Sequence, residues 1–382
     1  MIVAVPGEIA PGERRVALVP ESIKKLVKAG VSVRVQSGAG QASFIPDAEF
    51  KEAGAELVAD ALALYASGDF VVKVQPPGTS GGRHEADMIC EGAMLLGSLY
   101  PTRNAEIMQK LAARRVTAFS TDCIPRTTRA QAMDTLSSMA NIAGYKGVLL
   151  AADALPRYFP MFMTAAGTTF AAKVFVIGAG VAGLQAIATA KRLGAQVTAT
   201  DVRPEVKEQI QSVGAKYIGI ELKQSASAGG GYAGELSEED KKRQRELLVE
   251  HCATVDVVIT TALIGGVFAP KLISAEMVRS MRPGTVIVDL AAEGGGNCEL
   301  SKPGQTVVES GVTILAPLNL PSSMSNHASV LFSRNLTNFI LAFWKDGKFN
   351  LDLNDEILKG AVITHNGEIV HAKTKEAAGK RG

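Results

Sequence analysis

The sequence predicts an α/β protein with two domains, each built on a parallel sheet with helices on its faces. Three observations support this fold class. The chain has 382 residues, which is more than one compact core usually organises. Short apolar segments alternate with helical patterns in two separate series, as is typical of parallel βαβ units. A glycine cluster lies between a strand and a helix of the second series.

The composition is that of a globular protein. Hydrophobic residues make up 47% and charged residues 20% of the chain, and the formal net charge of +2 predicts no nucleic-acid partner. The four cysteines lie far apart without a C-x-x-C pair, so we expect reduced thiols and no metal site. No secretory signal is visible, and the uncharged stretch 174–190 is shorter than the about 20 residues of a membrane helix. These features predict a soluble, cytoplasmic protein.

The first series of elements occupies residues 1–125. Its β-branched, apolar runs predict strands at residues 1–6, 31–36, 69–75, 93–99 and 115–120. Helical patterns cover residues 20–30 and 104–115, and Gly30 ends the first of them as a C-terminal glycine does.

The second series begins at Lys173 and contains six strand candidates, as a complete doubly wound nucleotide-binding sheet requires. They cover residues 173–178, 196–201, 216–220, 255–262, 284–291 and 312–317. Helical patterns between them include residues 183–194 and 274–281.

Long helical patterns flank the second series, at about residues 129–155 and 328–344. We expect each to cross between the domains. The first domain would then be discontinuous, with residues 1–135 plus 326–382. The second would cover residues 136–325, and a cleft would separate two Rossmann-like domains.

The glycine cluster has the context of a dinucleotide fingerprint. Gly178, Gly180 and Gly183 follow a strand and open a helix, so the backbone can approach a pyrophosphate at the helix N-terminus. Asp201 ends the next strand, where a carboxylate accepts hydrogen bonds from the ribose hydroxyls and repels a 2′-phosphate. Arg203 nearby would favour NADP, but it does not remove the carboxylate of Asp201. We therefore predict NAD rather than NADP. A tight turn without a ligand is the alternative.

Groups able to move a proton are scarce. Of five histidines only His327 is a candidate to face the cleft, and a loop or capping role is its alternative. Lys73 is a second candidate, equally consistent with a buried strand lysine. A dehydrogenase acting on an alcohol or amine needs a general acid–base, so the sequence favours a reaction without one.

The segments "RTTRAQAMDTLSSMANIAGY", "GAGVAGLQAIATAKRLGAQVTATDVR", "AGGGYAGE" and "AAEGGGNCELS" closely resemble the NAD(H)-binding component of proton-translocating nicotinamide nucleotide transhydrogenase. The resemblance covers nearly the whole chain. More distantly, the chain is similar to alanine dehydrogenase, with which it shares the opening "PGE…RRVALVP". Alanine dehydrogenases carry a catalytic histidine where this chain has Leu99 and Tyr100, which argues against amino-acid dehydrogenation.

The resemblance assigns a role to residues 126–134, "RTTRAQAMD". It implies that Arg126, Gln131 and Asp134 act as catalytic residues that hold the nicotinamide end of NAD(H). Amide and carboxylate groups can bond the carboxamide, and a guanidinium can reach a phosphate or ribose. The alternative is an exposed helix start with Asp134 in its first turn. The residues expected to contact the nucleotide are Arg126, Thr127, Thr128, Arg129, Gln131, Asp134, Ser137, Gly178, Gly180, Val181, Gly183, Asp201, Val202, Arg203, Gly231, Tyr232, Gln244 and Leu263.

Residues 221–237 are too rich in glycine for a stable helix and carry Tyr232 as an aromatic tip. By the resemblance this segment is a lid that closes over bound nucleotide. A plain surface loop is the alternative.

The resemblance implies direct hydride transfer between NADH, bound here, and NADP⁺ on a separate component docked over the cleft. It also implies a homodimer that binds peripherally, on the cytoplasmic side, to a membrane subunit conducting protons. The rivals are a soluble amino-acid dehydrogenase and a non-catalytic NAD-binding regulatory subunit.

Overall fold

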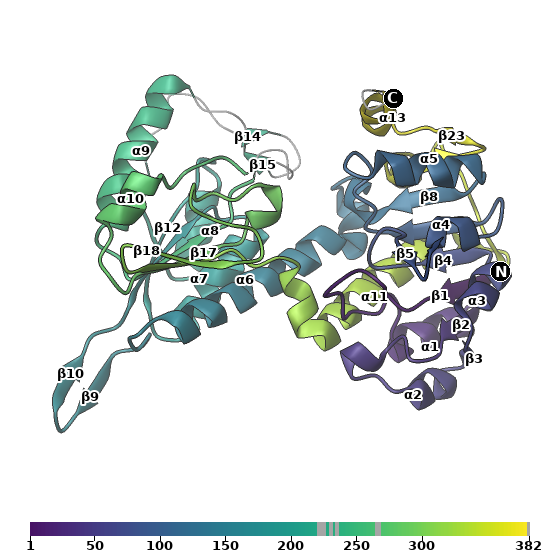
Figure 1. The fold of residues 1–382 in the computed structure, drawn as a ribbon, viewed down its shortest axis with the longest axis horizontal. Coiled ribbons are helices and arrows are strands. Elements are labelled where there is room, and N and C mark those ends of the chain that lie inside the picture. The colour runs from purple at the N-terminus through teal and green to yellow at the C-terminus, as the bar shows by residue number, and fades with distance from the viewer. Residues whose placement is uncertain (220–226, 229–231, 234–236, 264–268, 380–382) are drawn as a thin grey trace. The chain divides into compact units, whose positions relative to one another are not determined.

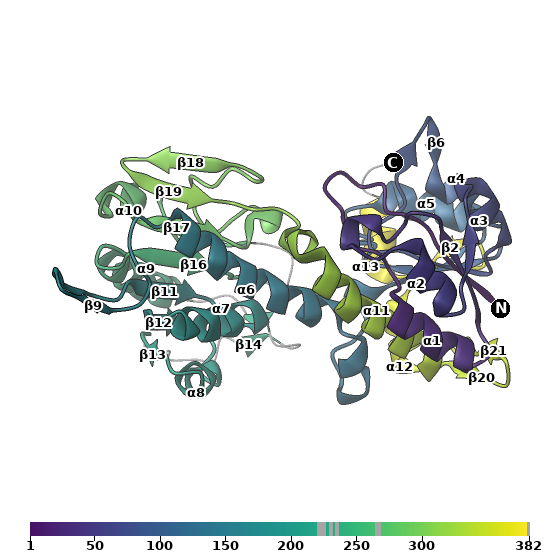
Figure 2. The ribbon, with the colours of Figure 1, turned by 90° about the horizontal axis from the view of Figure 1, so that it is seen from below.

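The computed structural model describes residues 1–219, 227–228, 232–233, 237–263 and 269–379. The chain divides into two compact units. Unit 1 comprises Met1–Met139 and Ser322–Gly382, and unit 2 comprises Ala140–Pro321. Each unit is an α/β layer structure, as Figures 1 and 2 show, so the predicted fold class is confirmed. The boundaries expected from the sequence, 135/136 and 325/326, stay a prediction about folding domains.

Unit 1 contains an eight-stranded sheet in the order β23-β22-β8-β7-β4-β1-β2-β3. Its strands are β1 (Ile2–Val5), β2 (Ser32–Gln36), β3 (Glu56–Val58), β4 (Phe70–Val72), β7 (Met94–Gly97), β8 (Thr117–Ser120), β22 (Val362–His365) and β23 (Glu368–Ile369). Six of them run parallel, and the two from the C-terminal segment are antiparallel additions at one edge. Strands β3, β22 and β23 are not among the strands predicted from the sequence.

Helices cover both faces of this sheet because the strands are apolar on both sides. In β1, Val3 and Val5 belong to one core, whereas Ala4 belongs to the other. The first core is closed by α1 (Pro20–Lys28), α2 (Asp47–Glu52), α11 (Ser325–Ala342) and α12 (Glu356–Ala361). The second is closed by α3 (Ala61–Ser67), α4 (Glu85–Met88) and α5 (Ala105–Ala113), and α13 (Ala372–Gly379) lies against α5.

Unit 2 contains a seven-stranded sheet in the order β13-β12-β11-β16-β17-β19-β18. Its strands are β11 (Lys173–Ile177), β12 (Gln196–Thr200), β13 (Lys216–Tyr217), β16 (Val257–Thr260), β17 (Val286–Asp289), β18 (Thr306–Glu309) and β19 (Val312–Leu315). All six predicted strands are present. The prediction missed β18, an antiparallel edge strand that forms a hairpin with β19.

The helices of unit 2 lie on both faces of the sheet, as in a doubly wound fold. One face carries α6 (Thr135–Ala154), α7 (Val181–Arg192) and α8 (Val206–Ser212). The other carries α9 (Glu238–Cys252) and α10 (Ala275–Ser280). A two-stranded hairpin, β9 (Phe162–Thr164) with β10 (Gly167–Thr169), projects from this unit in Figure 1.

Short elements complete the described chain. The two-stranded pieces are β5 (Thr79–Ser80) with β6 (Arg83–His84), β14 (Ser227–Ala228) with β15 (Tyr232–Ala233), and β20 (Trp344–Lys345) with β21 (Lys348–Phe349). The 3₁₀ helices are η1 (Gln41–Ser43), η2 (Thr121–Cys123), η3 (Thr128–Met133), η4 (Ala292–Gly294) and η5 (Leu320–Met324).

Both long helices begin elsewhere than predicted. The start predicted at about residue 129 is wrong, because residues 128–133 form η3 and α6 begins only after Asp134. The Asp134 carboxylate accepts a hydrogen bond from the backbone N–H of Ser137, as an N-cap residue does. Helix α11 begins at Ser325, before the predicted residue 328, in a polar segment that resembled a loop.

The polar start of α11 has a structural explanation. Ser329 and Ser333 lie one turn apart and are fully buried. Their hydroxyl oxygens accept hydrogen bonds at 3.0 Å from the backbone N–H groups of Val16 and Val19. The serines therefore provide hydrogen-bond acceptors for backbone N–H groups of a segment near the N-terminus that lies outside the sheet.

Candidate functional site

The turn between β11 and α7 leaves its backbone open to a ligand. Gly178 has φ +91°, a left-handed conformation that favours glycine, and a Cβ there would lie 2.8 Å from Thr261 Oγ1. A Cβ on Gly183 would collide with the carbonyl oxygen of Gly178, so this glycine permits close packing of α7 on the turn. Around Gly180 a Cβ would meet nothing within 4 Å. The first and third glycines thus serve packing, and the second leaves room for a phosphate group.

Asp201 lies beside this turn, at the end of β12, and is 9% exposed. Its Oδ2 accepts hydrogen bonds from the Ala179 N–H at 2.7 Å and from Arg203 Nη2 at 2.8 Å. Its Oδ1 accepts from the backbone N–H and the Nε of Arg203, both at 2.9 Å. These bonds raise the pKa of the Arg203 guanidinium, although burial opposes the shift. A carboxylate offers about four acceptor positions, so ribose hydroxyls would have to replace bonds from Arg203.

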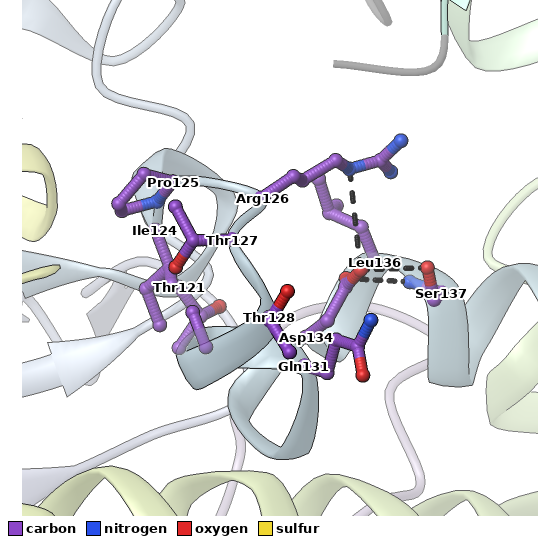
Figure 3. Close-up of a pocket in the computed structure, with 11 residues that line it drawn as sticks. Thr121, Ile124, Pro125, Arg126, Thr127, Thr128, Gln131, Asp134, Leu136 and Ser137 are labelled. Atoms are coloured by element: carbon purple, nitrogen blue, oxygen red, sulfur yellow. Dashed lines mark hydrogen bonds and ion pairs between the residues drawn. The ribbon is translucent and has the colours of Figure 1, made fainter.

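The second group of predicted residues lies in unit 1, around η3 (Figure 3). The two carboxylate oxygens of Asp134 accept hydrogen bonds from the N–H and hydroxyl of Ser137, at 2.8 and 2.7 Å. Arg126 Nε lies 3.9 Å from Asp134 Oδ2. Gln131 is exposed, and its amide has no hydrogen-bond partner among the residues that the structure describes. Asp134 is therefore fixed, whereas the Gln131 amide is available to a ligand.

These side chains line a pocket of about 340 Å³, within the range of small-molecule sites. Six predicted residues line it: Arg126, Thr127, Thr128, Gln131, Asp134 and Ser137. The hydroxyl of Thr127 is buried and has no partner within the described part of the chain. The donors and acceptors of this pocket fit a carboxamide and its ribose.

Several pocket residues were not predicted from the sequence. Thr121, Ile124, Pro125, Ala130 and Leu136 also line the pocket. They are small or apolar and match no motif, so nothing in the sequence distinguishes them from core residues.

Arg129 lies differently from its predicted neighbours. It is absent from the residues that line the pocket. Its Nη2 contacts both carboxylate oxygens of Asp355 at 2.6 Å. A contact between Arg129 and a nucleotide stays a prediction.

The remaining predicted residues lie in unit 2 or outside the described chain. Val181 begins α7, Val202 follows Asp201, and Gln244 is half-buried on α9. Leu263 is half-buried at the end of a described segment. Gly231, and the side chain of Tyr232 with most of the predicted lid, lie outside the described residues.

Lys73 is not a pocket residue. Its ammonium is fully buried, 2.9 Å from Glu85 and 3.3 Å from Glu8. The hydroxyl of Tyr65 donates to the same Glu85 oxygen at 2.7 Å. Burial alone would lower the pKa of Lys73, but the charges of Glu8 and Glu85 raise it. The buried-lysine interpretation is therefore the correct one.

Four of the five histidines hold structural positions. His84, His251, His365 and His371 bond Ala86, Thr198, Thr117 and Thr374 respectively. His327 is exposed on α11 and does not line the pocket. Over the described ranges, no helix combines the length and apolar character needed to cross a membrane.

Comparison with known proteins agrees with this architecture. The family model "Alanine dehydrogenase/PNT, N-terminal domain" matches residues 4–143, and "Alanine dehydrogenase/PNT, C-terminal domain" matches residues 147–372. The chain is 48% identical over 376 residues to an NAD(P) transhydrogenase subunit alpha protein of Rhodospirillum rubrum, covering 97% of this chain and 98% of the relative.

Two solved structures agree. The transhydrogenase from Sinorhizobium meliloti superposes with a TM-score of 0.88 at 44% identity, covering 97% of this chain and 100% of the other. An L-alanine dehydrogenase gives a TM-score of 0.81 at 25% identity, covering 100% of both chains. These matches confirm the resemblance seen in the sequence. The chain therefore belongs to the alanine dehydrogenase/PNT family and is more similar to these two transhydrogenases than to this alanine dehydrogenase.

Proposed function

We propose that this protein is the NAD(H)-binding component of a proton-translocating NAD(P) transhydrogenase, with NADP(H) held on a partner component. The observation that carries the proposal is the pocket at η3. It combines a guanidinium, an amide and a carboxylate, and neither a histidine nor a lysine is among its described lining residues. When bound, NADH supplies a hydride, whose direct passage to a second nicotinamide releases no proton at the carbon centre. Such a site has to orient its ligand and needs no side chain that gains or loses a proton.

Each pocket residue has a distinct part in this orientation. Asp134 is held by Ser137, so its carboxylate is a fixed acceptor for the N–H groups of a carboxamide. Gln131 can both donate to and accept from the same amide. Arg126, close to Asp134, offsets its charge and can reach a phosphate or ribose.

The adenosine end is assigned to the turn of unit 2. The open space around Gly180 and the N-terminus of α7 suit a pyrophosphate. Asp201 would accept the ribose hydroxyls in place of bonds from Arg203, and its charge would disfavour the 2′-phosphate of NADP. Val181 and Val202 adjoin these groups in the chain, and Gln244 and Leu263 belong to the same proposal. Gly231 and Tyr232 would form the lid.

The proposal includes partner subunits and a homodimer of this chain. NADP(H) and the proton path belong to a partner component and a membrane-spanning subunit, so the protein would act at the cytoplasmic side of the membrane. Hairpin β9–β10 supports a homodimer, because it presents large apolar side chains to solvent. Phe162 is 45% exposed, Met163 79% and the adjoining Phe170 71%. A cluster of exposed apolar side chains is typical of a protein–protein interface.

Stopped-flow hydride transfer tests the function. The protein, NADH and a partner component loaded with NADP⁺ are mixed, and oxidation of NADH is followed in a single turnover. Transfer that requires both components supports the proposal. Turnover with NAD⁺ and alanine alone would instead support an amino-acid dehydrogenase. NADH binding without either reaction would support a regulatory subunit.

A further inference from the structure

Two asparagines of α11 bind one backbone carbonyl of η3. The Nδ2 atoms of Asn335 and Asn338 each donate a hydrogen bond to the carbonyl oxygen of Ala132, both at 2.9 Å. Ala132 directly follows Gln131 and precedes Met133 and Asp134. The two amides therefore fix the backbone between the two side chains assigned to the nicotinamide.

Element η3 needs such support. A 3₁₀ helix has poorer hydrogen-bond geometry than an α-helix and is rarely longer than four residues, whereas η3 covers Thr128–Met133. Its N-cap residue, Thr127, makes no side-chain capping bond. The carboxylate of Asp134 bonds Ser137 at the start of α6 and contributes nothing to η3. The internal bonds of η3 therefore do not fix its position.

Apolar contacts and one ion pair add to the attachment. Ala130 and Met133, 2% and 5% exposed, belong to the same core as Leu336 of α11. These contacts hold η3 against the helix but do not specify its rotation. The ion pair between the single Nη2 atom of Arg129 and the carboxylate of Asp355 contributes weakly, because the arginine side chain is 55% exposed. The two amide bonds are directional, and they converge on a single oxygen.

We propose that Asn335 and Asn338 are positioning residues, which set the orientation of Gln131 and Asp134 toward the nicotinamide. This inference rests on the proposed function. The two asparagines are absent from the described residues that line the pocket and act through the backbone of Ala132. Removing them would let η3 shift without removing any ligand contact.

The expected signature separates rate from binding. Misplacement by about 1 Å costs on the order of 10²-fold in rate when a reaction depends on orientation. The double variant Asn335→Ala/Asn338→Ala should therefore slow single-turnover hydride transfer by roughly 10²-fold. The dissociation constant of NADH should change only a few-fold, because the pyrophosphate and adenosine contacts are assigned to unit 2.

A matched control lies on the same helix. Asn326, at the N-terminal end of α11, donates its amide to the carbonyl oxygen of Ser43 at 3.1 Å, remote in sequence from η3. The variant Asn326→Ala loses the same kind of bond and should transfer hydride at the normal rate. The exposed Asn338 allows a second test, because Asn338→Ala should fold even if the change at the buried Asn335 does not.

The experiment compares these variants by stopped-flow transfer with the NADP⁺-loaded partner, NADH calorimetry and thermal unfolding. A slow Asn338→Ala beside a normal Asn326→Ala, with nearly equal NADH affinities, supports the inference. Normal transfer by Asn338→Ala and by a folded double variant overturns it while the proposed function stands, since a structural role alone would change only the unfolding temperature. Absence of transfer in the unaltered protein overturns the proposed function, and the positioning role with it.

Discussion

Shortening one side chain of the pocket tests whether orientation is the basis of catalysis. The change Gln131→Asn keeps the amide but withdraws it by one carbon–carbon bond, about 1.5 Å. We expect the single-turnover hydride-transfer rate to fall by on the order of 10²-fold, because a misplacement of about 1 Å has that effect on an oriented reaction. This corresponds to about 2.7 kcal/mol of activation free energy.

The structure predicts that the rest of the protein will tolerate this change. The side chain of Gln131 is exposed and its amide bonds none of the described residues, so its shortening should alter the free energy of unfolding by no more than about 0.5 kcal/mol. NADH affinity should fall only slightly, since one amide bond contributes about 1 kcal/mol. Gln131→Glu is the matched control for length: it keeps the reach of the side chain but replaces the donor with a negative charge, so it reports on the chemistry of the amide rather than on its position.

The assay is stopped-flow mixing with the NADP⁺-loaded partner component, together with calorimetric titration of NADH and thermal unfolding. Wild-type transfer by Gln131→Asn would refute the reasoning, because the amide would then have no part in positioning. A loss of rate explained fully by weaker NADH binding would refute it too.

Three further predictions concern cofactor, substrate and core. Calorimetry should show that NADH binds far more tightly than NADPH, and Asp201→Ala should narrow this difference mainly by weakening NADH; equal affinities in the unaltered protein would contradict the assignment of Asp201. Purified protein with NAD⁺ and alanine should form no NADH above background, because no histidine lines the described pocket; robust formation would favour an amino-acid dehydrogenase. Lys73→Met should lower the free energy of unfolding in urea by about 3–5 kcal/mol, because it leaves Glu8 and Glu85 buried without a counter-charge. The exposed pair of Lys25 with Glu21 provides the control, where Lys25→Met should cost no more than about 1 kcal/mol.

The core of the fold could be predicted because its strands are apolar on both faces and alternate with helices. Elements with weaker patterns could not. Strand β18 is short and largely exposed, with polar residues at both ends, and is defined by its pairing with β19. Strands β22 and β23 join a sheet whose other strands lie more than 240 residues earlier, as the pairing of Val362 with Phe119 shows. Such contacts leave no local signal in the sequence.

The site could be predicted in part. The glycine spacing identifies the turn, because Gly178 and Gly183 meet local steric demands there and Gly180 leaves open space between them. The sequence also marked residues 126–134 as a polar cluster, but it placed the part from about residue 129 onward in a long helix, whereas Thr128–Met133 form η3. It did not indicate that Asp355 would pair with Arg129, or that Asn335 and Asn338 would bind Ala132. These contacts join segments more than 200 residues apart and depend on the folded position of α11 and α12.

The glycine turn of unit 2 and the pocket at η3 of unit 1 should respond differently to substitution. The turn of unit 2 offers backbone and open space, as at Gly180, and would contribute mostly affinity. The pocket of unit 1 offers the side chains of η3, whose backbone is bonded by two asparagines of α11. This pocket would contribute mostly the orientation of the nicotinamide. Gly180→Ala should therefore weaken NADH binding, because a methyl group enters the space left for the pyrophosphate, while transfer at saturating NADH stays near normal. A fall in the saturated rate equal to that of Gln131→Asn would show that affinity and orientation are not separable in this protein.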